Sequence, residues 1–557
     1  MTTPEMKDAW PRLNDEQWSR MVSYGAEKET TRTGDMLFHA GETGCPMILV
    51  ESGGVEILRT AGPQQEEVVV ASHSEHQFSG ELNLLTGQST YLSARVSEPG
   101  AVLRVHPASF RRLMDEDPEL SDIVLRALLA RREGLRVNAG AGTLVIVGRD
   151  MSAGAMALRT YAVRQRQPHT WVAAGTSAGE ALIKAAGAEA DELPVVITPT
   201  GVLRRATPAE LGEHLGMSYR PVAGQTLDLV VVGGGPAGLA AAVYGASEGL
   251  QTLVLDSVAT GGQAAASSRI ENYFGFTSGI SGADLTGRAV VQAQKFGARI
   301  ASPCEVARLD EDGDGDLLRL VLRDGTEIRS RAAVIATGAS YRSLPLPRWD
   351  HFLGAGVYYA ATELEARACG QRAVAVVGGA NSAGQAALYL AGRGSPVNLI
   401  LRGADLFAGM SSYLADRIQT HPAVTVHTST EVSELHGRES LHGLTVRSGT
   451  GGDVVETELE CWGLFCFIGA TPASDWLEGV ALDDHGFILT DVRIDDATLA
   501  PRWSELGRRP LPFETSLPRV FAAGDVRAGS MKRVAAAVGE GASTVRSVHM
   551  SLAPVSV

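Results

Sequence analysis

Residues 227–256 read LDLVVVGGGPAGLAAAVYGASEGLQTLVLD, and they indicate the architecture of the larger half of the chain. An apolar strand leads into the turn Gly-x-Gly-x-x-Gly, which is followed by an alanine-rich helix and a second apolar strand. Gly233, Gly235 and Gly238 let the backbone approach a pyrophosphate at the start of the helix. Asp256 ends the second strand, where a carboxylate can accept from a ribose hydroxyl. The stretch therefore predicts a βαβ unit that binds a dinucleotide.

A second motif lies near the C-terminus. The segment RVFAAGDVR (519–527) ends an apolar strand with Gly524-Asp525 and precedes a helix that contains AAVGEGAS. Together with the first motif it resembles the FAD-binding signature of flavoproteins that have two dinucleotide-binding domains. The segment GGQAAASSRIENYFGF (261–276) resembles the flavin-contacting loop of low-molecular-weight thioredoxin reductases. The resemblance to that family covers roughly residues 226–550.

This resemblance implies that the chain holds FAD and that Asp525 forms a hydrogen bond to the ribityl chain. The residues that match the family's FAD-binding motifs are Gly233, Gly235, Pro236, Ala237, Gly238, Asp256, Gly262, Gln263, Asn272, Thr337, Gly338, Gly524, Asp525, Arg533 and Val534.

A second dinucleotide fold is indicated by VAVVGGANSAGQAALYLA (374–391), which repeats the strand, turn and helix. Ala380 stands where a glycine is preferred. The next strand ends in Arg402 instead of an acidic residue, and an arginine suits the 2′-phosphate of NADP, so NADPH is favoured over NADH. A solvated strand end is the alternative reading of Arg402, and Arg417 assists only if a helix brings it near. The expected NADP-binding residues are Gly378, Gly379, Asn381, Ser382, Ala383 and Arg402.

The segment GAGVYYAATELEARACGQRAVAVVGG (354–379) aligns with the part of thioredoxin reductases that carries the redox-active Cys-x-x-Cys. Ala360 and Glu363 stand at the two sulfur positions. Disulfide exchange needs one thiolate that attacks and a second thiol that resolves, so we expect the electrons to leave by another route. Glu363 is the candidate to hydrogen-bond near the flavin or to act on protons. Ferredoxin–NADP reductases built on this scaffold also lack the cysteine pair.

The five cysteines are Cys45, Cys304, Cys369, Cys461 and Cys466. Their odd number and scattered positions predict reduced thiols and a cytoplasmic location. Cys461 and Cys466 lie in an apolar, strand-like segment, and strand alternation would send them to opposite faces. A disulfide reductase that uses Cys369 or an external thiol protein is the remaining dithiol-type alternative.

Residues 34–106 show short alternating apolar segments separated by glycine, which is typical of an all-β domain. The segments at 35–58 and 78–96 resemble the cyclic-nucleotide-binding β-roll of the catabolite activator type. In that family a Gly-Glu pair holds the cyclic phosphate and the ribose 2′-OH, and Gly80 and Glu81 match it.

The phosphate-binding arginine of that family should fall at position 90, where this chain has Thr90. Loss of a hydrogen bond to a charged group costs about 1.5–3 kcal/mol. Arg95 replaces the arginine only in a shifted register. Cyclic nucleotide binding therefore stays open against a structural or docking role.

Residues 142–218 predict the order strand, helix, strand, helix, two strands and a helix. They resemble a thioredoxin or glutaredoxin fold, with Pro194 at the family's cis-proline position. The segment GRDMSAGA (148–155), where the Cys-x-x-Cys of that family should follow the first strand, contains no cysteine. We expect this domain to be redox-silent.

The predicted fold class is α/β overall, with two Rossmann-like three-layer dinucleotide-binding domains, one inserted in the other, after a β-roll with helices and a small thioredoxin-like domain. The expected domains are 1–137 (cyclic nucleotide-binding-like), 138–221 (thioredoxin-like), 222–343 with 466–557 (FAD-binding) and 344–465 (NAD(P)-binding).

A net charge of −15 argues against a nucleic-acid binder, and no apolar stretch is long enough to predict a membrane span. No metal ligand set is expected. The predicted function is an FAD-dependent oxidoreductase that takes hydride from NAD(P)H and reduces an unidentified acceptor. A small redox protein is one candidate for this acceptor. A sensory or scaffolding flavoprotein is the alternative. The family resemblance implies a homodimer through the flavin domains.

Overall fold

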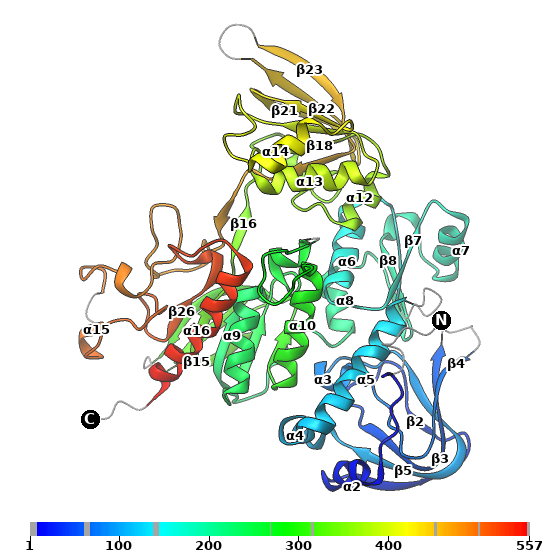
Figure 1. The fold of residues 1–557 in the computed structure, drawn as a ribbon. Helices are drawn as coiled ribbons and strands as arrows, with labels where there is room; N and C mark the ends of the chain where they lie inside the picture. Colours follow the sequence, from blue (N-terminus) through cyan, green and yellow to red (C-terminus); the bar gives the residue numbers. More distant parts are fainter. Residues whose placement is uncertain are drawn as a thin grey trace.

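The structure is a computed structural model that describes residues 8–60, 67–137, 144–267, 269–313, 317–449, 454–499 and 502–553. The chain folds into four units, and colours from blue to red follow the sequence through them in Figure 1. Two separate parts of the chain build the third unit.

The N-terminal unit is a β-roll, which confirms the all-β prediction. Its antiparallel strands pair in the order β1-β5-β3-β4, and β2 pairs with β5. The strands are β1 (Glu27–Thr31), β2 (Met36–Phe38), β3 (Met47–Thr60), β4 (Glu67–His73) and β5 (Ser93–Val105). The helices are α2 (Asp15–Ser23), α3 (Asn83–Thr86), α4 (Pro107–Glu116) and α5 (Pro118–Val137).

The second unit has the element order that the sequence predicts. Its sheet runs β7-β6-β8-β9, with β6 and β7 parallel and the other pairs antiparallel. The elements are β6 (Leu144–Gly148), α6 (Ala153–Arg164), β7 (His169–Ala173), α7 (Ser177–Ala185), η2 (Ala190–Glu192), β8 (Val195–Thr198), β9 (Gly201–Leu203) and α8 (Pro208–His214). The Leu193–Pro194 peptide bond is cis. Membership of the thioredoxin fold stays a prediction.

The third unit is built around one sheet to which two distant parts of the chain contribute. Parallel strands pair in the order β12-β11-β10-β15-β26, and β14 and β13 extend the sheet as antiparallel strands. The strands are β10 (Thr226–Val232), β11 (Thr252–Leu255), β12 (Arg299–Ala301), β13 (Val306–Asp312), β14 (Leu317–Leu322), β15 (Glu327–Ile335) and β26 (Val520–Ala522). The helices are α9 (Pro236–Ser247), η3 (Gly262–Ala266), α10 (Gly282–Lys295), η4 (Asp491–Arg493), α15 (Arg502–Glu505), η5 (Gly524–Val526) and α16 (Val534–Leu552).

The fourth unit lies within the third in sequence. Its parallel sheet runs β17-β24-β18-β19-β20, and a three-stranded antiparallel sheet β21-β22-β23 covers it. The elements are α11 (Trp349–Phe352), β17 (Val357–Tyr358), α12 (Glu363–Cys369), β18 (Val374–Val377), α13 (Asn381–Gly392), β19 (Val397–Ile400), α14 (Ser412–Gln419), β20 (Val424–His427), β21 (Thr430–Gly437), β22 (Leu441–Ser448), β23 (Val455–Glu460) and β24 (Gly463–Cys466). The connecting ribbon is β16 (Ala339–Tyr341) paired with β25 (Ala470–Pro472).

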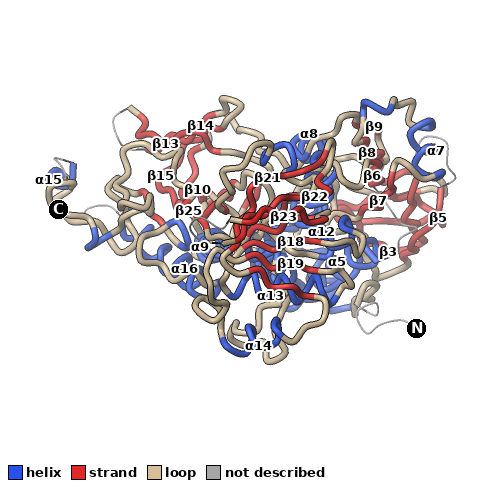
Figure 2. Tube along the Cα trace, turned by 90° about the horizontal axis from the view of Figure 1, so that it is seen from above, coloured by secondary structure: helices blue, strands red, loops and turns tan. Residues whose placement is uncertain are grey.

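Each large sheet has apolar clusters on both faces, which makes both dinucleotide-type units three-layered. The fourth unit lies between β15 and β26 of the third in sequence, which confirms the predicted insertion of one dinucleotide-type domain in the other. Cys466, the predicted first residue of the returning FAD segment, lies in β24 of the inserted sheet, so the insertion ends after it. Seen from above, β18 and β19 of the inserted unit lie between β10 and β15 on one side and β6 and β8 on the other (Figure 2).

Candidate functional site

The carboxyl ends of the parallel strands bring the predicted FAD-binding residues to one sheet edge. Gly233 follows β10, Asp256 follows β11, Thr337 and Gly338 follow β15, and Gly524 follows β26. Ligands of open α/β sheets bind outside these strand ends, so the topology alone assembles the site.

The glycine turn after β10 is shaped by two close backbone contacts. A Cβ on Gly233, whose φ is +108°, would lie 2.3 Å from the carbonyl oxygen of Ala336, and a Cβ on Gly238 would lie 1.8 Å from that of Gly233. At Gly235, the N-cap of α9, a Cβ would meet nothing nearer than the Cα of Gly262 at 3.9 Å. The start of α9 is thus open to a ligand, and its geometry fits a pyrophosphate.

Asp256 is held rigidly beside this turn. Its carboxylate accepts hydrogen bonds from the backbone N–H of Gly234 (2.8 Å) and of Val258 (2.9 Å). The residue is only 9% exposed, and burial raises the pKa of its carboxyl group. The remaining lone pairs of a carboxylate in this position can accept from a ribose hydroxyl.

The second FAD motif closes the site from β26. Gly524 has φ +77°, and a Cβ there would lie 2.8 Å from the Cβ of Ala237 in the first turn of α9. Its N–H donates to Glu540, which also forms a 2.8 Å ion pair with Arg527. Burial raises the pKa of the neighbouring Asp525, whereas Lys532 opposes the shift.

The other predicted FAD residues have individual local roles. The Thr337 hydroxyl donates to the carbonyl oxygen of Ala473 (2.7 Å), and the Gln263 amide donates to that of Ala339. Gly262 opens η3 with φ +54°, Gly338 has φ +71°, and Arg533 and Val534 form the N-cap and first residue of α16. Asn272 lies in an exposed loop after η3.

Two features near this edge could not be predicted from the sequence. Burial raises the pKa of both Asp256 and Tyr341, and the charge of Arg164, at the end of α6 in the second unit, opposes both shifts. Tyr341 in β16 also stacks on Tyr359, with ring centroids 5.5 Å apart. Both features bring together segments that are far apart in the sequence, and motifs within one segment do not predict such contacts.

The predicted NADP site repeats the strand, turn and helix at β18 and α13. Gly378 has φ +142°, and a Cβ there would lie 2.4 Å from the carbonyl oxygen of Phe467, so glycine is required. Ala380 is the exposed N-cap of α13, and the Asn381 side-chain oxygen accepts from the Ser411 N–H (2.8 Å). Gly379 and Ser382 are exposed at the same turn, and Ala383 is buried.

Arg402 follows β19 and is exposed, with no ion pair in the described part of the chain. Its guanidinium is therefore available to a phosphate. Arg417 lies in the last turn of α14 and is also exposed. The pairing of Arg402 with a 2′-phosphate stays a prediction.

All five cysteines are free, and four of them are buried. Burial raises the thiol pKa to about 11 for Cys45, Cys304 and Cys466 and to about 12 for Cys369 and Cys461. Cys461 precedes the short strand β24 and Cys466 ends it, and both belong to one apolar cluster, so the expectation of opposite strand faces was wrong. Thiols with these pKa values are not nucleophiles at neutral pH.

The segment that holds Ala360 and Glu363 runs from β17 into α12. Thr362 caps the helix, and Glu363 is its first residue. The Glu363 carboxylate contacts Arg367 (2.8 Å), Arg393 and the Tyr389 hydroxyl (3.3 Å). These partners all belong to α12 and the end of α13, so the role of Glu363 at a flavin stays a prediction.

The start of α6 packs against this same segment. The Tyr358 hydroxyl lies 3.9 Å from the sulfur of Met151, and a Cβ on Gly354 would lie 3.3 Å from the Cα of Ala153. Met156 belongs to one apolar cluster with Tyr358 and Cys369. The start of α6 in the second unit thus lies beside the segment of the fourth unit that runs from β17 into α12 (Figure 1).

In the β-roll, Gly80 and Glu81 stand before α3. Gly80 has φ +127°, and Glu81 forms a two-pronged ion pair with the buried Arg132 of α5. The Thr90 hydroxyl donates to the carbonyl oxygen of His39 (2.9 Å). Arg95 pairs with Glu56 (3.3 Å) and Glu67 (2.8 Å) outside the cavity of this unit, so the shifted-register substitute was wrong.

No helix in the described ranges is long and apolar enough to cross a membrane. Within those same ranges, no group of three or more metal-ligating side chains is placed to hold an ion.

Comparison with known proteins agrees with this architecture. A family model for pyridine nucleotide-disulphide oxidoreductases matches residues 227–541, and one for the cyclic nucleotide-binding domain matches residues 28–117. Thioredoxin reductase of Streptomyces clavuligerus is 32% identical over 331 residues, 59% of this chain and 95% of that protein. NADPH-dependent thioredoxin reductase 3 of Arabidopsis thaliana is 33% identical over 56% of each chain. The crystal structure of T. acidophilum thioredoxin reductase aligns with a TM-score of 0.50 and 27% identity over 58% of this chain and 98% of that one.

Proposed function

Because the chain belongs to the pyridine nucleotide-disulphide oxidoreductase family, we propose that it is an FAD-dependent NAD(P)H oxidoreductase that reduces an acceptor other than a dithiol of its own. Thioredoxin reductases of this family use FAD and NADPH. When bound, FAD supplies the chemistry that takes hydride from a nicotinamide and releases electrons to an acceptor. The protein supplies binding, orientation and electrostatics.

The observation that carries this proposal is the state of the thiols. All five are free, and burial raises each pKa to about 11 or 12. Disulfide exchange needs a thiolate with access to its partner, and its rate falls with the thiolate fraction. Cys369 is fully buried, so it does not serve as a substitute. Ala360 and Glu363 offer no sulfur in the segment before the second dinucleotide fold.

The cofactor-binding roles follow from the glycine turns. Gly233 and Gly238 let α9 start against the sheet edge, and open space at Gly235 leaves its first N–H groups for the FAD pyrophosphate. Asp256 accepts from a ribose hydroxyl, and Asp525 accepts from the ribityl chain. Gly378 gives the same opening at α13, and Arg402 selects the 2′-phosphate of NADPH.

The packing of α6 favours an acceptor that is not a thioredoxin. Met151, Ala153 and Met156 lie against the segment around Tyr358 and Gly354. A protein that approaches Ala360 from that side meets the chain's own second unit first. The acceptor we propose is a small redox protein, a quinone or dioxygen.

A sensory flavoprotein is a second candidate, and one observation favours it. Val291 of α10, in the FAD unit, belongs to the apolar cluster of the β-roll, and Met156 belongs to that of the fourth unit. Each of the two N-terminal units thus shares an apolar cluster with the reductase half, as a regulatory connection requires. In this reading FAD binds without useful turnover.

Anaerobic mixing with NADPH separates the two candidates. We expect the visible absorbance of the oxidised flavin to bleach within the time of one enzymatic turnover, which is about 0.1–1 s for a typical kcat. Acceptors are then added one by one: ferredoxin, flavodoxin, a quinone and oxygen. Flavin that stays oxidised with NADPH contradicts the enzyme and leaves the sensory protein. NADPH-dependent reduction of thioredoxin and a disulfide dye would instead establish a dithiol route.

The family resemblance also leads us to propose a homodimer through the flavin domains and a cytoplasmic location. Sedimentation velocity of the full chain tests the first, and fractionation of the source cells tests the second. A monomer at micromolar concentration contradicts the dimer.

A further inference from the structure

Helix α6 of the second unit ends beside the FAD-type site of the third. Arg164 is its last residue, and Gln165 is its C-cap. The Gln165 amide donates to the Ser302 hydroxyl (3.0 Å), which donates in turn to the carbonyl oxygen of Val258 (3.2 Å). The N–H of Val258 donates to the carboxylate of Asp256 (2.9 Å). The end of α6 is therefore tied by hydrogen bonds to the segment that begins at Asp256.

This segment, residues 256–263, lies against the glycine turn that fits a pyrophosphate. The N–H of Gly261 donates to the carbonyl oxygen of Gly234 (2.7 Å). A Cβ on Gly234 would lie 3.4 Å from the methyl group of Thr260. Thr260 and Arg164 both line a small cavity between α6 and α10. Arg164 therefore lies on the α6 side of the segment that supports the glycine turn.

The charge of Arg164 acts on two groups of the site. Burial raises the pKa of the Asp256 carboxyl group and of the Tyr341 hydroxyl, and Arg164 opposes both shifts. Asp525 acts on Tyr341 in the opposite direction, so Tyr341 lies within electrostatic reach of both. Asp256 and Asp525 are assigned to the two sugar parts of FAD, and the pyrophosphate joins those parts. Arg164 thus acts over the span that the pyrophosphate occupies.

Arg164 is partly buried and has neither a hydrogen bond nor an ion pair among the described residues. Two other arginines line the same cavity, and both are paired. Arg132 forms an ion pair with Glu81, and Arg166 lies 3.8 Å from the carboxylate of Asp284. Arg164 is therefore the arginine of this group whose donors are available to a ligand.

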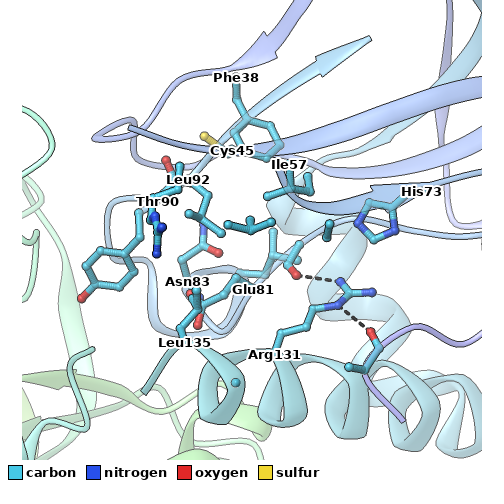
Figure 3. A pocket seen from close by; sticks show the side chains of 18 of the residues that line it. Phe38, Cys45, Ile57, His73, Glu81, Asn83, Thr90, Leu92, Arg131 and Leu135 are labelled. Carbon is cyan, nitrogen blue, oxygen red and sulfur yellow. Dashed lines mark hydrogen bonds between the residues drawn. The ribbon is translucent and has the colours of Figure 1, made fainter. Parts of the chain in front are cut away.

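Arg131 of α5 shows how the fold satisfies a buried guanidinium when it serves structure alone. It lines the β-roll cavity, where its nitrogens donate to the carbonyl oxygens of Ala9 (2.8 Å), Gly80 (2.7 Å) and Phe78 (2.9 Å) (Figure 3). Arg164 has no such acceptors in the part of the chain that the structure describes. Removing a charge from water without a partner is costly, so an anion at Arg164 would be stabilised.

The loops around the glycine turn supply no positive charge of their own. Residues 233–238, 256–263 and 336–340 contain neither lysine nor arginine, and Asp256 adds a negative charge. The N–H groups at the start of α9 bind a pyrophosphate with only the partial charge of the helix dipole. A guanidinium complements the phosphate oxygens because its N–H donors match them in pairs.

We propose that Arg164 binds the pyrophosphate of FAD, so that the second unit completes the cofactor site of the third. This inference rests on the FAD binding of the proposed function. It adds a cofactor-binding residue from outside the region that matches the oxidoreductase family, residues 227–541. A basic residue in the last turn of a helix also stabilises the helix dipole, but that role alone leaves FAD affinity unchanged.

The FAD dissociation constant of the full chain, measured by equilibrium dialysis, tests the proposal. We expect Arg164→Gln and Arg164→Met to raise this constant about tenfold or more, because each removes a hydrogen bond to a charged group. Arg164→Lys should raise it less, since an ammonium keeps the charge but loses the paired donors. Arg166→Gln removes a paired arginine from the same cavity and is the matched control, with wild-type affinity expected.

Salt dependence separates a charged contact from a loss of packing. The screening length falls from about 30 Å at about 0.01 M salt to about 10 Å at about 0.1 M. Over this range the FAD dissociation constant of the wild-type chain should rise more steeply than that of Arg164→Gln or Arg164→Met. A variant that loses packing alone would keep the wild-type slope.

Melting curves identify the variants that fold, and either charge-removing variant is sufficient for the test. Wild-type affinity in a folded Arg164→Gln or Arg164→Met variant would overturn the inference. An equal loss of affinity in Arg166→Gln would also overturn it, because the effect would then come from the junction between the units. A wild-type chain that binds no FAD would refute the proposed function together with this inference, whereas tight and equal FAD binding by all variants would refute the inference alone.

Discussion

The rings of Tyr341 and Tyr359 stack at a centroid distance of 5.5 Å and an angle of 9°. Tyr341 lies in the connecting strand β16, and Tyr359 directly precedes Ala360. The Tyr359 hydroxyl also accepts a hydrogen bond from Trp349 (2.9 Å). One side chain thus connects the ribbon to the segment that carries Ala360 and Glu363.

Replacement of Tyr359 tests the importance of this tie. An aromatic pair contributes about 0.5–1.5 kcal/mol beyond area burial. We expect Tyr359→Ala to lower the melting temperature more than Tyr359→Phe, which keeps the ring and loses only the contact with Trp349. Differential scanning calorimetry measures both. Equal melting temperatures for the two variants would show that the stack contributes nothing.

Gly238→Ala should abolish FAD retention. The new Cβ would lie 1.8 Å from the Gly233 carbonyl oxygen, so the turn that receives the pyrophosphate must move. The flavin-to-protein ratio after gel filtration measures the effect, and we expect a fall of at least tenfold. Gly539→Ala in α16 is the matched control because a Cβ there meets nothing within 4 Å. Full FAD content in the Gly238 variant would contradict the assigned turn.

Arg402→Leu should raise KM for NADPH and leave KM for NADH unchanged. Loss of a charge-assisted contact to the 2′-phosphate costs about 1.5–3 kcal/mol, which is about tenfold or more in kcat/KM. Arg111→Leu removes an exposed arginine from α4 of the β-roll, far from the coenzyme motifs in the fold, and serves as the control. Equal losses with both coenzymes would favour the solvated strand end.

These tests depend on features that the sequence reveals to different degrees. Gly233, Gly378 and Gly524 could be predicted because a strand, a turn and a helix follow one another locally, and parallel pairing then brings distant strand ends to one edge. The long offset between the glycine turns at Gly233 and Gly378 also predicts the nested insertion.

The contacts between units could not be predicted. Met151 meets Tyr358, and Val291 joins the β-roll cluster, through single side chains without any repeating pattern. The partner of Glu81 was missed for the same reason, since Arg132 comes from a helix that the motif does not include. Long-range electrostatic partners depend on packing, which neighbouring residues do not encode.

Glu363→Gln tests the predicted role of this carboxylate. Glu363 pairs with Arg367 and Arg393 and is partly exposed, so we expect a loss of at most about 1 kcal/mol in stability. If the carboxylate acts at the flavin, its replacement by the amide should also change the reduction potential of the flavin or the rate of its reoxidation. Arg367→Gln disturbs one of the same ion pairs without touching the carboxylate and is the control. Unchanged potential and reoxidation would rule the role out.

Thiol alkylation at several pH values tests the observation on which the proposed function depends. A thiol whose pKa is raised to about 11 is only about 0.1% thiolate at pH 8, and each pH unit toward the pKa increases this fraction tenfold. We therefore expect iodoacetamide to label the folded protein slowly at pH 8 and faster as the pH rises. Cys304, which is partly exposed, should react before Cys369 and Cys461, which are fully buried. Mass spectrometry of the labelled peptides measures each site, and the unfolded protein, in which all five thiols react, is the control. Rapid labelling of any folded thiol at pH 7, especially if NADPH accelerates it, would reveal a reactive sulfur and restore the dithiol route.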